Sequence, residues 1–78
     1  MADTPVPRII DARELAPPEP MELTLEALDT LPRGEELQLW LLREPFPLYN
    51  ILKNNGFAHR VEYCDDGRFI VHIRHAGA

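Results

Sequence analysis

The sequence is short of thiols and of long apolar runs. Its 78 residues include one cysteine, Cys64, so a disulfide within the chain is excluded, and a reducing cytoplasm is the expected compartment. No apolar run approaches the roughly 20 residues that a membrane-spanning helix needs. We therefore expect a cytoplasmic protein with no membrane partner.

Clustered cations are also missing. The formal net charge is −5, and residues 1–44 carry four Arg against ten Asp and Glu, whereas residues 45–78 carry four Lys and Arg against three acids. A protein that binds the nucleic-acid backbone needs clustered Lys and Arg to displace phosphate counterions. We therefore expect no nucleic-acid partner, and a solvated surface explains the acidic half.

The length predicts one small domain with a thin core. Residues 1–7 show no periodicity and are expected to form a flexible lead-in, and residues 8–76 are expected to form a single domain. A chain of this size buries only about 60% of the surface that it exposes when unfolded. A partner or a self-association surface would therefore add usefully to its stability.

Apolar periodicity and turn residues predict six elements. The stripe of Met21, Leu25, Leu28 and Leu31 has helical spacing, and Pro32 and Gly34 end that helix. The expected order is a strand over 8–12, a helix from 18 or 19 to 31, a strand over 36–43, a helix with Leu48, Ile51 and Leu52 buried and Gly56 at its end, and a hairpin with strands over 58–64 and 68–75.

The register of the hairpin follows from the requirement that each face be consistent. A two-residue turn at Asp66 and Gly67 would pair Tyr63 with Ile70 and would mix apolar and charged side chains on both faces. A three-residue loop with Gly67 in the left-handed region instead pairs Tyr63 with Phe69 and makes one face apolar. We predict this second register.

The order β-α-β-α-β-β predicts an α+β two-layer sandwich. Right-handed crossovers place both helices on one face of a four-stranded mixed sheet and leave the other face open. We expect the open face to carry an apolar group that can bind a partner or is covered in part by the lead-in. Its members are Trp40, Leu42, Ile70 and one of Ile9 or Ile10, and the same face is expected to carry His72.

The segment Asp11-Ala12-Arg13-Glu14-Leu15-Ala16-Pro17-Pro18-Glu19-Pro20 resembles the signature Asp-x-Arg-Gly-Leu-x-Cys-Pro-x-Pro of the TusA-like (SirA-like) sulfur carriers. The cysteine position of that signature is Pro17 and the glycine position is Glu14. The resemblance implies strand order 1-2-4-3, as in the C-terminal domain of bacterial translation initiation factor three. The other defined positions of the signature match this sequence at Asp11, Arg13, Leu15, Pro18 and Pro20.

A second segment, Arg43-Glu44-Pro45-Phe46-Pro47-Leu48, resembles a landmark of a cysteine-less branch of this superfamily, the domain of unknown function 2249. That branch has an acid followed by Pro-x-Pro-Leu, here Glu44, Pro45 and Pro47. Its members occur beside or fused to other domains, including hemerythrin-like ones. The resemblance therefore implies an accessory role in redox, respiratory or sulfur metabolism of a bacterium.

No catalytic group is found at the start of the first helix. A sulfur carrier uses a thiolate stabilised by the helix dipole, but Pro17 has no nucleophilic atom, and residues 15–20 contain no Ser, Thr, Cys, Lys or His. Sulfur transfer is therefore not expected. Asp11 and Arg13 leave an extended segment on the same side, so we interpret them as a structural pair, with Arg13 the better candidate for contact with an anionic partner.

A metal or cofactor is not expected either. Zinc or iron needs three or four convergent ligands, and the hairpin register separates Cys64 from His72 and turns His72 and His75 to opposite faces.

We therefore expect a non-catalytic domain that acts through protein contacts or self-association. Its candidate surface consists of Trp40, Leu42, Ile70, His72 and Arg13. One alternative is a small-ligand, anion-binding or redox module that uses the start of the first helix with Arg13, or uses Cys64. Another alternative is a scaffold that binds sulfur carriers without holding sulfur.

Overall fold

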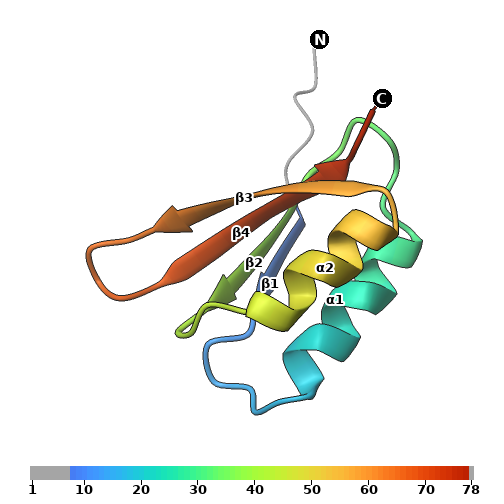
Figure 1. Cartoon of the computed structure of the whole chain (residues 1–78). Helices are drawn as coiled ribbons and strands as arrows, with labels where there is room; N and C mark the ends of the chain where they lie inside the picture. The colour runs from blue at the N-terminus through green and yellow to red at the C-terminus, as the bar shows by residue number, and fades with distance from the viewer. Residues whose placement is uncertain (1–7, 78) are drawn as a thin grey trace, which may run out of the picture.

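A computed structural model describes residues 8–77 of the chain (Figure 1). The lead-in expected over residues 1–7 lies outside this part. The elements are β1 (Arg8–Asp11), α1 (Glu19–Asp29), β2 (Leu37–Leu41), α2 (Phe46–Asn54), β3 (Phe57–Tyr63) and β4 (Phe69–His75). Their number and order are those predicted from the sequence, with ends that differ by one or two residues.

The four strands form one mixed sheet in the order β1-β2-β4-β3. β1 and β2 are parallel, and β4 runs antiparallel to both of its neighbours. The strand order that the resemblance implied is therefore confirmed. β1 lies at one edge of the sheet and β3 at the other.

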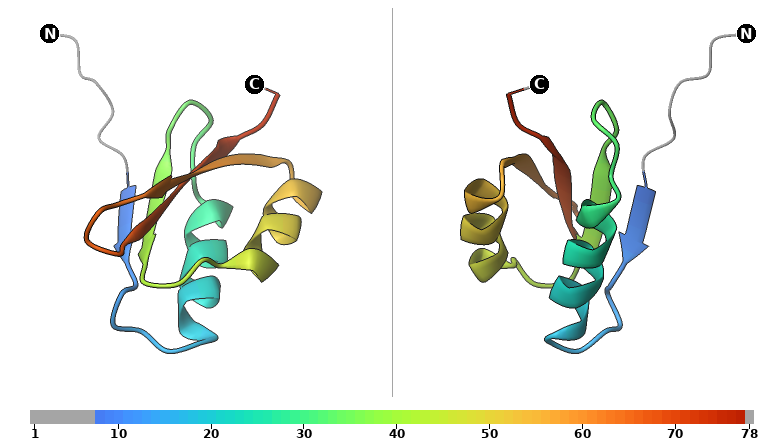
Figure 2. Two further views of the ribbon diagram at one scale, coloured as in Figure 1. Left: turned by 60° about the vertical axis from the view of Figure 1, so that its left-hand side comes forward. Right: turned by 90° about the vertical axis from the view of Figure 1, so that its right-hand side faces the viewer.

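Both helices cover the same face of the sheet, as Figure 2 shows from two further sides. The core lies between the two layers and takes alternate residues of the inner strands, because successive strand side chains point to opposite faces. Its fully buried members are Leu37 and Leu39 of β2, Val71 and Ile73 of β4, and Leu48 and Leu52 of α2. The expected two-layer α+β sandwich is confirmed.

The buried stripe of α1 differs from the predicted one at a single position. Leu25, expected in the stripe, is 39% exposed, and Thr24 is fully buried in its place. The Thr24 hydroxyl donates a hydrogen bond to the Pro20 carbonyl at 2.7 Å, so no polar group is left unpaired and the side chain packs as a small apolar one. The helix also ends at Asp29 rather than Leu31, because the N–H groups of Thr30 and Leu31 bond three residues back.

The predicted hairpin register is confirmed. Tyr63 lies opposite Phe69 and Val61 opposite Val71. Gly67 has a φ of +91°, the left-handed conformation that the three-residue loop requires.

The face of the sheet opposite the helices carries Ile9 of β1 and Trp40 of β2. Ile9 is 51% exposed, whereas Ile10 packs against the core, which decides between the two candidates that the sequence left open. Trp40 pairs in register with Ile70. Trp40 therefore lies on the open face, as predicted.

Candidate functional site

Asp11 and Arg13 form a two-point ion pair in the loop that leaves β1. Nε and Nη2 of Arg13 donate to the two carboxylate oxygens of Asp11 at 2.8 and 2.7 Å. The hydrogen bond from the Arg13 side chain holds the pKa of Asp11 below its ordinary value. The pair braces the entry to α1, which supports the structural interpretation of these motif residues.

The motif prolines form the start of α1. Pro18 is the N-cap residue, the Pro17–Pro18 peptide bond is cis, and no side chain caps the helix. The N–H of Glu19 bonds to the Ala16 carbonyl at 3.0 Å and that of Glu22 to the Pro18 carbonyl at 3.1 Å. The N–H groups of Glu19 and Glu22 are therefore occupied, and residues 15–20 contain no Ser, Thr, Cys, Lys or His.

Trp40 lies beneath two guanidinium groups. The guanidinium carbons of Arg13 and Arg68 are 5.5 and 4.9 Å from the centroid of its ring, and its indole N–H donates to the Gln38 side-chain oxygen at 3.1 Å. Arg68 is held in turn by Asp66, at 3.2 Å. Trp40 therefore presents an arginine-covered ring to solvent rather than a bare apolar surface.

Ile70 and His72 occupy the open face as predicted, but each is only 8% exposed. His72 is covered because two carboxylates hold it: Nδ1 lies 2.6 Å from Glu36 and Nε2 lies 2.9 Å from Glu62. Each ring nitrogen of His72 thus lies within hydrogen-bonding distance of a carboxylate oxygen. These two members of the predicted surface therefore offer a partner little contact area.

The three most exposed large apolar side chains lie next to or within the second motif and at the end of β3. Leu42, Phe46 and Tyr63 are 55%, 66% and 64% exposed, and we call these three residues the Glu44 surface. Sequence reasoning found only Leu42. Tyr63 was expected on the apolar face of the hairpin, opposite Phe69, but it ends β3 and so lies at the margin of the sheet.

Glu44 organises this surface. One of its carboxylate oxygens, Oε2, accepts hydrogen bonds from the hydroxyls of Tyr49 and Tyr63, each at 3.1 Å. Burial, followed by the Glu44 contact, raises the pKa of Tyr49 well above its ordinary value, and the Glu44 hydrogen bond raises the pKa of Tyr63. Tyr49 also stacks on His59, with ring centroids 4.5 Å apart. The acid of the second motif thus ties the β2–α2 loop to α2 and to β3.

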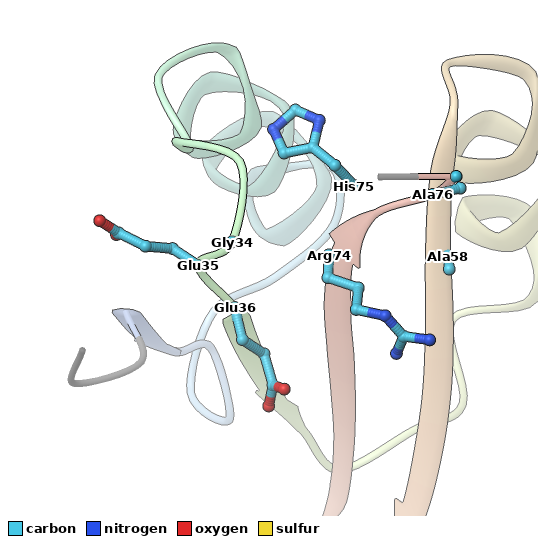
Figure 3. Close-up of a pocket in the computed structure, with 8 residues that line it drawn as sticks. Gly34, Glu35, Glu36, Ala58, Arg74, His75 and Ala76 are labelled. Carbon is cyan, nitrogen blue, oxygen red and sulfur yellow. The ribbon is translucent and has the colours of Figure 1, made fainter. Parts of the chain in front are cut away.

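A hollow of about 370 Å³ lies at the other end of the sheet (Figure 3). The side chains of Glu36 and Arg74 lie on the same side of the sheet in this view, whereas His75 points away from them. Nε2 of His75 donates to the Leu31 carbonyl at 2.7 Å, so this ring has a structural role. The ionisable side chains that line the hollow are therefore Glu35, Glu36, Arg74 and His75.

Neither a metal cluster nor a spanning helix is found between residues 8 and 77. No group of three or more His, Cys, Asp and Glu side chains in this range is arranged to hold a metal ion. Cys64 is half-buried with a free thiol. Within the same range, neither helix has the length and apolar character needed to cross a bilayer.

The structure is a small two-layer α+β domain in which the Glu44 carboxylate accepts hydrogen bonds from Tyr49 and from the exposed Tyr63. The sequence model of the family described as "Uncharacterized conserved protein (DUF2249)" matches residues 9–75, so the chain belongs to this family. None of the curated proteins matches the chain.

Proposed function

We propose that this chain is a non-catalytic domain of the TusA-like superfamily that binds another protein through the Glu44 surface. The observation that carries the proposal is the exposure of Leu42, Phe46 and Tyr63, each more than half accessible. Aromatic and aliphatic side chains of this size are frequent anchors in protein interfaces. The proposal moves the contact surface from Trp40 to the end of β2 and the start of α2.

Hydrogen bonding gives this surface a defined shape before a partner arrives. Tyr63 is fixed through its hydroxyl to Glu44, and Phe46 packs edge-on against Tyr49 with ring centroids 6.1 Å apart. Side chains that are already ordered lose less conformational entropy on binding. This preorganisation favours protein recognition over a role in solubility.

The absence of a nucleophile at residue 17 supports the non-catalytic part of the proposal. Pro17 occupies the position of the sulfur-carrying cysteine in the resembling family, and Arg13 already binds Asp11. An accessory role in redox or sulfur metabolism of the bacterial cytoplasm rests on the resemblance alone.

The test compares partner capture by the natural chain and by Phe46→Ser. The tagged natural protein is used to capture partners from its native cytoplasm, and the affinity of the principal partner is then measured for both chains. Loss of an exposed aromatic anchor should weaken the complex by about 2 kcal/mol, roughly thirtyfold. The circular dichroism spectrum should not change, because Phe46 is 66% exposed.

Leu23→Ser provides the matched control. Leu23 is an exposed apolar residue of α1, outside the Glu44 surface, and its replacement should leave the affinity unchanged. Equal binding by Phe46→Ser and the natural chain would contradict the proposal, as would a loss caused equally by Leu23→Ser.

A further inference from the structure

β3 is a long edge strand whose charged residues, Arg60 and Glu62, have opposite signs. It has seven residues, compared with four in the other edge strand, β1, and it contains no Pro, Gly or Lys. Natural edge strands are usually kept apart by such residues, by bulges or by covering segments. In Figure 1, no described element lies beyond β3, and its end, with the hairpin, extends past both helices.

The hydrogen bonds of the hairpin identify the free backbone groups of β3. The Gly56 carbonyl accepts from the Ala76 N–H, and the Cys64 N–H donates to the Arg68 carbonyl, each at 2.9 Å. In an antiparallel ladder, residues that bond to the neighbour alternate with residues whose N–H and C=O point the other way. The even-numbered residues of β3 therefore bond to β4. His59, Val61 and Tyr63 direct their backbone groups outward.

We propose that β3 pairs with β3 of a second copy of this chain, antiparallel and about a two-fold axis at Val61. Only outward-directed residues can bond across such an interface, so an odd-numbered residue must lie opposite an odd-numbered one. Val61 then faces Val61 of the second copy, and His59 faces Tyr63. The two sheets join into one with both pairs of helices on the same side.

Charge selects this register over its neighbours. With Val61 on the axis, Arg60 of each copy lies opposite Glu62 of the other, in a non-hydrogen-bonded pair whose side chains approach closely. Shifting the axis by one residue in either direction places Arg60 opposite Arg60 or Glu62 opposite Glu62. Like charges directly opposite are destabilising, so the two adjacent registers are disfavoured.

The two charged side chains are available for this contact. Both are exposed, and within residues 8–77 Arg60 has no ion pair. Glu62 uses Oε1 for His72 and keeps Oε2 for a second partner. In the same register His59, whose ring stacks on Tyr49, lies opposite the exposed Tyr63 of the other copy. The interface is therefore self-complementary in charge as well as in backbone hydrogen bonds.

This proposal is independent of the proposed function, which concerns a different protein and a surface centred on Glu44. The two surfaces share Tyr63, so the experiment changes only Arg60 and Glu62 and leaves Phe46 and Leu42 intact. Failure of one proposal therefore does not decide the other.

The test is a charge swap followed by analytical ultracentrifugation of the full chain. Arg60→Glu and Glu62→Arg should each raise the dissociation constant of the dimer about tenfold or more, because each places like charges opposite at two symmetry-related positions. The double variant with both changes should restore dimerisation to within about threefold of the natural chain. Arg74→Glu is the matched control, since Arg74 is exposed on the inner strand β4 and should leave the dimer unchanged.

Amide hydrogen exchange gives a second readout that requires no variant. The outward N–H of Val61 should become protected as the protein concentration rises, whereas the N–H of Glu62, bonded to β4, should be protected at every concentration. If the chain stays monomeric up to about 1 mM, the affinity of the dimer is negligible and the proposal is wrong. A double variant that fails to recover dimerisation, or an Arg74→Glu variant that loses it, also overturns the proposal.

Discussion

The guanidinium carbon of Arg68 lies 4.9 Å from the centroid of the Trp40 ring, while the carboxylate of Asp66 holds the same guanidinium at 3.2 Å. Arg13 covers Trp40 in the same way, at 5.5 Å, and is itself held by Asp11. Each arginine is thus fixed by an aspartate two residues earlier in the chain. The single tryptophan is therefore covered without being part of the core.

This relationship predicts the effect of removing one guanidinium. Arg68→Met should destabilise the domain by about 0.5–1 kcal/mol through loss of the cation–π contact. The change should also shift Trp40 emission to longer wavelength and increase quenching by acrylamide, because more of the ring meets water. Fluorescence is specific here since Trp40 is the only tryptophan.

Arg74→Met is the matched control for this measurement. Arg74 is an exposed arginine of β4 that makes no cation–π contact with Trp40 among the described residues. An unchanged emission spectrum for Arg68→Met, or an equal shift for the control, would show that the arginine does not cover the ring.

The hairpin loop makes a prediction about backbone conformation. Gly67 has a φ of +91°, and a Cβ at this position would meet no atom within 4 Å. Gly67→Ala should therefore cost about 1 kcal/mol purely through the left-handed backbone, measured by urea denaturation. Gly67→Asn should cost less, since asparagine tolerates this region, and equal losses for both variants would refute the explanation.

The two tyrosines predict a delayed alkaline titration. Their phenol pKa values are raised from the ordinary 10, that of Tyr49 mainly by burial and that of Tyr63 mainly by the Glu44 hydrogen bond. A raised folded-state pKa contributes stability that is fully present below pH 10 and is lost as the pH rises through the folded value. Absorbance titration of tyrosinate should therefore begin above the range of a free phenol, and stability should fall over the same interval.

Glu44→Gln tests the cause of this delay. The substitution removes the negative charge but keeps an acceptor oxygen, so the pKa of Tyr63 should fall toward 10, while Tyr49 should keep the part of its shift due to burial. Both signals belong to the residues in question because the chain contains only two tyrosines. A titration curve identical to that of the natural chain would rule out the carboxylate as the cause.

Pro17 predicts the absence of sulfur loading. After incubation with a cysteine desulfurase and cysteine, the Cys64→Ser variant should gain no sulfur atom by mass spectrometry, because the chain then has no thiol to accept one. The natural chain serves as the comparison, and any uptake by it should be confined to Cys64. A stable sulfur adduct on Cys64→Ser would show an acceptor that the motif does not reveal.

The strand order of the sheet was implied by the family resemblance, whereas the sequence by itself determined the elements and the hairpin register. Each of these follows from short-range rules: helical or alternating spacing, the conformational freedom of Gly67, and the requirement that one hairpin face be apolar. The motif also located the pairing of Asp11 with Arg13, because residues two apart in an extended segment share a side.

Only the tertiary structure decided which side chains on the open face and around the motifs are accessible. Trp40 and His72 were expected to belong to an accessible interaction surface, but Arg68 covers the first and Glu36 and Glu62 enclose the second. These partners come from distant parts of the chain, so no local pattern predicts them. Burial depends on the assembled neighbours of a side chain, whereas secondary structure depends largely on the chain's own spacing.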